Sequence, residues 1–350
     1  MSNNYKPILR TTKLVKKRKL KKRFFLIMIP LIILLSAGIF AGYLYIKADS
    51  VLKDSFDDEG REKSELRDKI VDPKVDDVSV LIMGVDESDK RENSDSARTD
   101  TLMVATLNKE ERSIKLLSIP RDSWVYIPEV DYINKINHAH AYGGTKATID
   151  TVENLLEIPI DYYVKINFEA FIKVVDSLNG ITVDVPYELQ EQDSKDKANA
   201  IHLYPGEQLL NGEEALALAR TRKLDNDIER GKRQQEIIKS IIDKSISLNS
   251  ILKYDDIIEA IGGNMTTNMT FSEMKSFIAY GVQGNDLKVD TLTLEGKDMW
   301  VYNPNKLYYY ELDEEALEET KQVLKEHLNL NYFSSSDTAD EDLSANQLNE

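Results

Sequence analysis

Apolar and polar positions follow one another in short blocks along most of the chain, and these blocks predict strands and helices in turn. VSVLIMGVD, which starts at Val78, is apolar and ends in Gly and Asp, as expected of a buried strand that leads into a loop. TLMVATLN (101–108) and SIKLLSIP (113–120) predict two more strands. The polar KEER between them predicts an antiparallel pair.

The same alternation continues beyond these strands. GGTKATIDTVENLLEI has helical spacing after a Gly-Gly break, DYYVKINF predicts a strand, EAFIKVVDSL a helix, and ITVDVP a strand after Asn179-Gly180. Further helices are predicted at 213–219, 229–246, 254–260, 271–280 and 313–328, with a late strand at 287–294. The pattern predicts an α/β fold, a single α/β/α layered domain with a central mixed sheet.

One apolar run, FFLIMIPLIILLSAGIFAGYLYI (24–46), is too long for a strand or an ordinary core helix. As a helix it extends about 34 Å, enough to span a hydrocarbon core of about 30 Å. A cleaved signal peptide is the alternative, because small residues at 36–38 and 41–42 suit a peptidase. The length of the run, with Tyr43 and Tyr45 as an interfacial belt, favours an uncleaved transmembrane signal-anchor helix.

Charge is distributed unevenly on the two sides of this run. Ten of the 45 basic residues lie within residues 1–23 and one is Lys47. Residues 48–350 therefore contain 34 basic and 61 acidic residues, which gives them a net charge of −27. A basic tail before the run predicts a single-pass type II protein of the cell membrane, with residues 48–350 outside. DNA binding by the tail is the weaker alternative, since it adjoins the membrane and would contact anionic lipid. We expect no nucleic-acid partner.

The segments that flank the predicted domain have their own composition. Residues 47–77 mix both charges densely and predict a partly helical stalk that holds the domain off the membrane. Residues 331–350 end in SSSDTADEDLSANQLNE, which predicts a disordered acidic tail. The predicted domain therefore covers residues 78–330. The absence of cysteine excludes disulfides and thiolate metal sites.

Five charged stretches adjoin predicted strand ends or helix starts, where sites usually lie in α/β domains. A single such pair is an ordinary solvated salt bridge, but five together favour a site. Their chemistry-bearing residues are Asp86 in GVDESD, Arg98 and Asp100 in SARTDT, Arg121 and Asp122 in LSIPRDSWV, Lys135 in KINHAHAYGG, and Arg220, Arg222, Arg230, Arg233 and Gln234 in ARTRKLDNDIERGKRQQ.

Several arginines beside a few carboxylates point to a particular chemistry. Guanidinium groups match phosphate oxygens in a bidentate manner, and a few carboxylates suit Mg²⁺, which takes its other oxygens from water and substrate phosphates. The set predicts a phosphate or pyrophosphate site with a magnesium bridge, in which phosphoryl transfer needs no protein nucleophile. No P-loop or dinucleotide fingerprint is present. Zinc at His138 and His140 is the weaker alternative, because the other candidate ligands are oxygens.

The blocks MGVDESD, ARTDT, LSIPRDSWV, KINHAHAYGG, VDSLNGITVDVP, LNGEEALALARTRK and DIERGKRQQ resemble, in order, those of the LytR-CpsA-Psr family. The resemblance covers residues from about 78 to 247. Members are phosphotransferases outside the Gram-positive membrane, and they move an anionic glycopolymer from an undecaprenyl-pyrophosphate carrier to a muramic acid hydroxyl of peptidoglycan. The short basic tail, single anchor and lack of an accessory domain resemble its Bacillus-type teichoic acid transferases, so wall teichoic acid is the expected polymer.

The resemblance also implies roles for individual residues. Asp86 and Asp100 match magnesium ligands, and Asp227 matches the leading acid of the last block. A hydrophobic pocket for the polyprenyl chain is implied too, but aliphatic helix faces look alike whether they meet lipid or core, so its lining is not predictable. The sequence departs from the common pattern of the family at Asn179 and Leu218, and neither position belongs to the charged set. The pyrophosphate-binding set is Arg98, Arg121, Lys135, Arg220, Arg222, Arg230, Arg233 and Gln234; the catalytic set is Arg98, Asp100, Arg121 and Asp122, with Asp122 or Asp100 as the candidate base.

Two other functions share these features. A pyrophosphatase acting on the same lipid carrier, with water as acceptor, would use the same residues. A non-enzymatic membrane-bound regulator would depend on the basic tail, which is short and lacks a helix-turn-helix pattern.

Overall fold

The computed structural model describes residues 50, 53, 55–85, 98–222, 226–246, 263–282, 287–303 and 305–330. The predicted basic tail, membrane anchor and acidic tail lie outside these residues, as do Asp86 and the helix predicted at 254–260. The chain divides into two units, Met1–Lys47 and Ala48–Glu350, and the described residues all belong to the second. Within the described ranges, no helix combines the length and the apolar character needed to cross a bilayer.

A six-stranded mixed sheet forms the centre of the domain. Its order is β11-β6-β1-β2-β3-β12. β2 runs antiparallel to both β1 and β3, and β11 runs antiparallel to β6, whereas β1–β6 and β3–β12 are parallel. The strands are β1 (Val78–Val85), β2 (Thr99–Asn108), β3 (Ser113–Ser118), β6 (Tyr162–Ile166), β11 (Met265–Thr267) and β12 (Lys288–Thr293).

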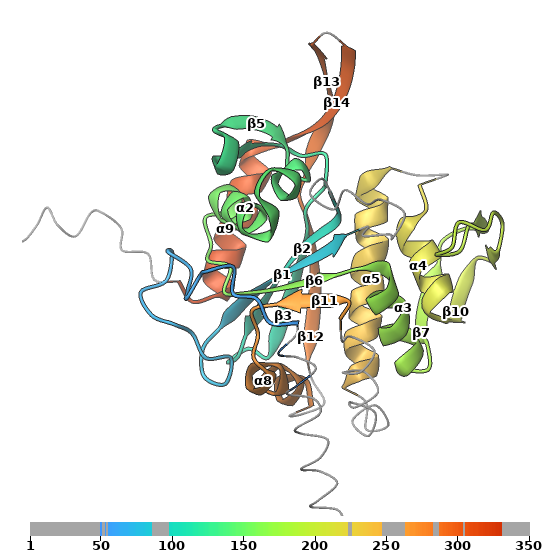
Figure 1. Ribbon diagram of the computed structural model, residues 1–350, viewed down its shortest axis with the longest axis horizontal. Coiled ribbons are helices and arrows are strands. Elements are labelled where there is room, and N and C mark those ends of the chain that lie inside the picture. Colours follow the sequence, from blue (N-terminus) through green and yellow to red (C-terminus); the bar gives the residue numbers. More distant parts are fainter. Residues whose placement is uncertain are drawn as a thin grey trace, which may run out of the picture. The chain divides into compact units, whose positions relative to one another are not determined.

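Helices cover both faces of this sheet (Figure 1). On one face, Leu81 and Met83 of β1 share a core with α2 (His138–Leu156) and α9 (Glu314–His327). On the other, Val80 of β1 shares a core with α5 (Asp227–Ser245) and α8 (Phe271–Val282). Alternate residues of β1 thus face two apolar layers, which explains why its sequence is almost continuously apolar. The predicted α/β/α layering with a mixed sheet is confirmed.

A third apolar cluster lies beside α5. It joins α3 (Phe168–Ser177) and α4 (Gly212–Arg220) to a two-stranded antiparallel sheet of β7 (Ile181–Val185) and β10 (Gly206–Leu210). Asn211 caps α4 in a capping box with Glu214, which fixes where the helix begins. The short strands β8 (Leu189–Glu191) and β9 (Ile201–Leu203) complete this group.

Two further hairpins were not predicted from the sequence. One pairs β4 (Trp124–Ile127) with β5 (Tyr132–Lys135) through the short helix η2 (Pro128–Val130). The other pairs β13 (Gly296–Asn303) with β14 (Asn305–Leu312) and extends beyond the central sheet at the top of Figure 1.

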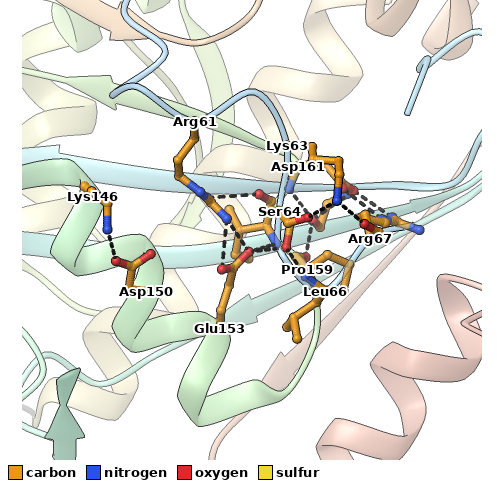
Figure 2. A network of polar contacts seen from close by, with 12 residues as sticks. Arg61, Lys63, Ser64, Leu66, Arg67, Lys146, Asp150, Glu153, Pro159 and Asp161 are labelled. Carbon is orange, nitrogen blue, oxygen red and sulfur yellow. Dashed lines mark hydrogen bonds and ion pairs between the residues drawn. The ribbon is translucent and has the colours of Figure 1, made fainter. Parts of the chain in front are cut away.

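The segment predicted as a stalk over residues 47–77 instead packs on the domain over its described part from Ser55 onward, so the prediction of a spacer is wrong there. Arg61 donates to both carboxylate oxygens of Glu153 at 2.8 and 2.9 Å, and Arg67 lies 2.7 Å from Asp161 (Figure 2). Val71 is buried in the core. A dense mixture of charges looks solvated in the sequence, but here the arginines have carboxylate partners on α2 and at the start of β6.

Candidate functional site

A cavity of about 620 Å³ lies between the central sheet and helices α3, α4 and α5. One part of its wall is apolar and comes from strands and helices together. The other part is polar and rich in arginine. The apolar lining residues are Ile82, Met103, Ile166, Phe168, Phe171, Leu216, Ala217, Ala219, Ile237 and Ile238; the polar side includes Asp100, Arg121, Arg220, Arg222, Arg230 and Gln234, with Asn167, Glu191 and Gln192.

Arg121 lies at the centre of the polar part, on the loop that follows β3. Its Nη1 is 2.7 Å from Oδ1 of Asp100, while its Nε is 3.6 Å from Asp227 and 3.8 Å from Asp122. The buried Ser123 hydroxyl donates to the Pro120 carbonyl and fixes the shape of this loop. Three carboxylates therefore hold one guanidinium group at the cavity wall, as the adjacency of Arg121 and Asp122 to a strand end predicted.

Arg230 extends the network from the first turn of α5. Its Nη2 lies 2.8 Å from Asp227 and donates to the backbone carbonyl of Asp100 at 3.3 Å. Burial lowers the pKa of Arg230, an effect that Asp227 opposes. Because an arginine pKa starts far above neutrality, the group stays charged. The structure thus brings two cations, Arg121 and Arg230, to the same Oδ1 oxygen of Asp227.

The end of α4 supplies the next two arginines. Arg220 is the last residue of the helix, and its guanidinium lies 4.6 Å from the ring centroid of Phe168. Arg222 is exposed two residues later and lines the cavity. Gln234 of α5 donates to the Ala219 carbonyl at 3.1 Å, which ties the two helices together at this point. All four cavity-lining arginines come from loop or helix-end positions, as predicted.

Arg233 has a different position from the one predicted. It is buried, and its guanidinium donates to the carbonyls of Leu218 at 3.3 Å and Thr221 at 2.6 Å. It is absent from the lining of the cavity in the described structure. The assignment of Arg233 to pyrophosphate binding is therefore corrected: it binds the carbonyl end of α4 and holds that end against α5.

Lys135 and Asp122 form an ion pair beside Arg121, and neither is among the residues that line the cavity. Lys135 Nζ is 2.7 Å from Asp122 Oδ1 and 5.5 Å from the ring centroid of Tyr309. Lys135 is absent from the lining, so the structure gives it a contact with Asp122 rather than with the cavity.

Arg98 and His138 lie near each other beside the network. Arg98 is exposed at the start of β2. Burial lowers the pKa of His138, and the charges of Arg98 and Lys135 lower it further. Burial and these two cations therefore favour the neutral form of His138, although the charge of Asp122 opposes them.

The predicted magnesium ligands are described only in part. Asp100 lies at the cavity with a side chain that is 41% exposed, while Asp86 lies outside the described residues. Within the described ranges, no group of three or more His, Asp or Glu side chains is arranged to hold a metal ion. The pair of Asp86 and Asp100 stays a prediction.

The LytR_cpsA_psr family matches residues 42–326. The polyisoprenyl-teichoic acid–peptidoglycan teichoic acid transferase TagT of Bacillus subtilis (strain 168) is 40% identical over 317 residues, covering 89% of this chain and 97% of that protein. TagU of the same strain is 39% identical over 317 residues, covering 89% of this chain and 98% of that protein.

The fold is also similar to solved structures of one of these relatives, TagT. TagT bound to LIIa-WTA is 38% identical, with a TM-score of 0.67 over 79% of this chain and 99% of that one. TagT with bound octaprenyl pyrophosphate lipid is 37% identical, with a TM-score of 0.62 over 77% of this chain and 98% of that one. The expected resemblance is confirmed, and the expected enzyme class agrees with relatives that are named transferases. The chain belongs to the LytR_cpsA_psr family.

Proposed function

We propose that the protein is a phosphotransferase that moves an anionic glycopolymer, with wall teichoic acid as the favoured polymer, from a polyprenyl-pyrophosphate carrier to a peptidoglycan hydroxyl. One observation carries this proposal: a single cavity is lined by aliphatic and aromatic side chains on one part and by four arginines on the other. A polyprenyl chain joined to a pyrophosphate has the same two parts. The relative TagT has been solved with octaprenyl pyrophosphate and with LIIa-WTA, which supports the assignment.

The arginines stabilise the negative charge of the phosphates during the transfer. The acceptor hydroxyl oxygen attacks the phosphorus next to the glycopolymer, the bond from that phosphorus to the bridging oxygen breaks, and polyprenyl phosphate leaves with the bonding electrons. Arg121, Arg220 and Arg230 hold the pyrophosphate oxygens and neutralise the charge that develops on the leaving phosphate. The hydroxyl proton passes to a carboxylate, for which Asp122 and Asp100 are the candidates.

We include Mg²⁺ as the cofactor of this site. The donor chemistry fits, because the Asp100 carboxylate is partly exposed at the arginine-rich wall and Mg²⁺ needs few protein ligands when phosphates supply the rest. Asp100 would hold the ion together with Asp86, and the ion would neutralise phosphate charge.

We also propose that residues 24–46 anchor the protein in the cell membrane, with the basic tail inside and residues 48–350 outside. The apolar run and the basic residues before it support this orientation. The anchor would keep the cavity near the membrane in which its lipid-linked donor resides.

The test uses full-length protein, lipid-linked polymer and labelled peptidoglycan in a magnesium-buffered assay. We expect Arg121→Ala or Asp100→Ala to lower transfer at least about 100-fold, because each removes charge stabilisation at the transferring phosphate. Both variants should stay folded and membrane-bound. Lys146→Ala is the matched control, since Lys146 forms only an exposed pair with Asp150 and should leave transfer unchanged.

Near wild-type transfer by either variant would contradict the assignment. Release of free polymer alone in the presence of acceptor would support the pyrophosphatase instead. Chelation of Mg²⁺ should lower transfer by the wild type. Deletion of residues 2–20 should leave transfer intact, whereas its loss would favour a role for the basic tail.

A further inference from the structure

The β13–β14 hairpin carries a row of aromatic side chains on one face. The register pairs Trp300 with Tyr308 and Tyr302 with Lys306, so these four residues share a face with Asp298. Trp300 and Tyr302 are 50% and 73% exposed. The hairpin extends beyond the central sheet in Figure 1. Asp298 and Lys306 are exposed as well, while Tyr308, nearer the base of the hairpin, is half-buried.

Polar groups lie between the rings and hold them in place. Trp300 and Tyr308 make an edge contact with centroids 5.2 Å apart. The Tyr308 hydroxyl donates to Asp298 at 3.0 Å, and Lys306 Nζ lies 4.2 Å from the Trp300 centroid. These contacts restrict the Trp300 and Tyr308 rings, so both are partly preorganised for binding.

The base of this face reaches the candidate active site. The Tyr310 backbone amide donates to the Asp122 carbonyl at 2.9 Å, so β14 is joined to the Arg121 loop. A second cavity, of about 290 Å³, lies at this junction. Asp122 and Asp227 line it together with Asp298, Tyr308 and Tyr310 of the hairpin. These two aspartates approach Nε of Arg121, which also lines the larger cavity, so both cavities adjoin the same charge network.

We propose that the face formed by Asp298, Trp300, Tyr302, Lys306 and Tyr308 binds the glycan strand of peptidoglycan and guides the acceptor hydroxyl into the second cavity. This inference rests on the proposed function. Sugar rings present flat C–H surfaces that stack on aromatic faces, and their hydroxyl and amide groups need hydrogen-bonding partners beside the rings. From Asp298 to Tyr302 the face extends roughly 13 Å, enough for more than one sugar ring.

The arrangement favours a glycan over a membrane surface. A carboxylate set among the rings is costly to insert into lipid, whereas it can accept hydrogen bonds from sugar hydroxyls. Asp122 and Asp227 line the adjoining cavity, where a carboxylate can accept the proton of an acceptor hydroxyl, and a glycan carries such hydroxyls whereas a lipid chain does not. The glycan would approach from the hairpin while the lipid-linked donor occupies the larger cavity.

The inference is tested by steady-state kinetics of transfer with the full-length protein. The acceptor is un-crosslinked glycan strands from which teichoic acid has been stripped. In the double variant Trp300→Ala, Tyr302→Ala, we expect the KM for the acceptor to rise at least about tenfold. Aromatic side chains that become buried in a complex commonly contribute most of its binding energy. The kcat and the affinity for the lipid-linked donor should stay near wild type. Leu307→Ala is the control, since Leu307 is exposed on the opposite face of the same hairpin.

Co-sedimentation with stripped peptidoglycan gives a second readout that does not depend on transfer. The double variant should lose binding that the Leu307→Ala variant keeps, even if the enzyme proves to be a hydrolase. Unchanged KM and unchanged co-sedimentation would overturn the inference.

Fluorescence separates the glycan from the membrane. Trp124 and Trp300 are the only tryptophans of the chain, so a Trp124→Phe variant reports on Trp300 alone. Glycan strands should change its emission, while brominated lipids in proteoliposomes should not quench it. Quenching by brominated lipid without a response to glycan would assign the face to the membrane and overturn the inference.

Discussion

At the scale of single residues, the site alternates cations with carboxylates. Asp227 lies 2.8 Å from Arg230 and 3.6 Å from Arg121, and Arg121 also contacts Asp100. Guanidinium groups this close would repel one another without the acids between them. The carboxylates therefore hold the arginines in a fixed arrangement before an anion binds, which lowers the cost of ordering them during the reaction.

Arg233 and Arg220 should separate stability from binding. In Arg233→Leu, the Leu218 and Thr221 carbonyls lose their donor inside the protein, so we expect the free energy of unfolding to fall by about 2–4 kcal/mol. Transfer per folded molecule should change little. Arg220→Ala should do the opposite, with weaker binding of polyprenyl pyrophosphate and nearly unchanged stability.

Thermal unfolding and donor-binding measurements on the two variants check this pair. A stable Arg233→Leu protein that no longer binds the donor would restore Arg233 to the pyrophosphate site.

The sequence predicted which residue types form the site better than it predicted which side chains line the cavity. Arg121, Arg220 and Arg230 were expected from their places at strand and helix ends. Arg233 and Gln234 follow Arg230 at helical spacing, and both were assigned to the pyrophosphate site. Only Gln234 lines the cavity, because the end of α4 lies against Arg233. That contact depends on tertiary packing, which helical periodicity does not contain.

At the scale of elements, the long apolar strands and the amphipathic helices were predictable, whereas the short strands and the exposed hairpins were not. β1, β2 and β3 have apolar runs because both faces of the sheet are covered. β13 and β14 carry exposed aromatic and charged residues instead, so periodicity gave no signal for them. The segment before β1 was misjudged for a related reason: its arginines have partners far along the chain, such as Glu153 and Asp161, that no local pattern reveals.

The packing of this segment should be energetically significant. The Asp161 side chain is only 1% exposed and accepts from Arg67 and from the Ser79 backbone. Arg67→Ala leaves that carboxylate buried without its cation, so we expect a loss of roughly 3 kcal/mol or more in the free energy of unfolding.

Lys69→Ala is the matched control for Arg67→Ala in denaturant unfolding. Lys69 pairs with Asp76 from a side chain that is 71% exposed, and its loss should cost less than about 1 kcal/mol. A loss for Arg67→Ala as small as that for Lys69→Ala would contradict the stabilising role of the Arg67–Asp161 contact.

At the scale of the whole molecule, the cavity brings together parts of the chain that are distant in sequence. Ile82 of β1, Phe171 of α3 and Ile238 of α5 line the same apolar wall. Each resembles an ordinary core residue in the sequence, which is why the charged half of the site was predictable and the apolar half was not. The arginines add a cationic end to this cavity in a domain region of strong negative net charge, so an anionic headgroup has one favoured place to bind.

The most direct test of the account is the electron density of a crystal of this protein soaked with polyprenyl pyrophosphate and Mg²⁺. We predict the pyrophosphate between Arg121, Arg220 and Arg230, with the chain extending along the apolar wall past Phe171 and Ile237. Density for the lipid at another surface, with the cavity filled by solvent alone, would contradict the assignment of this cavity to the carrier.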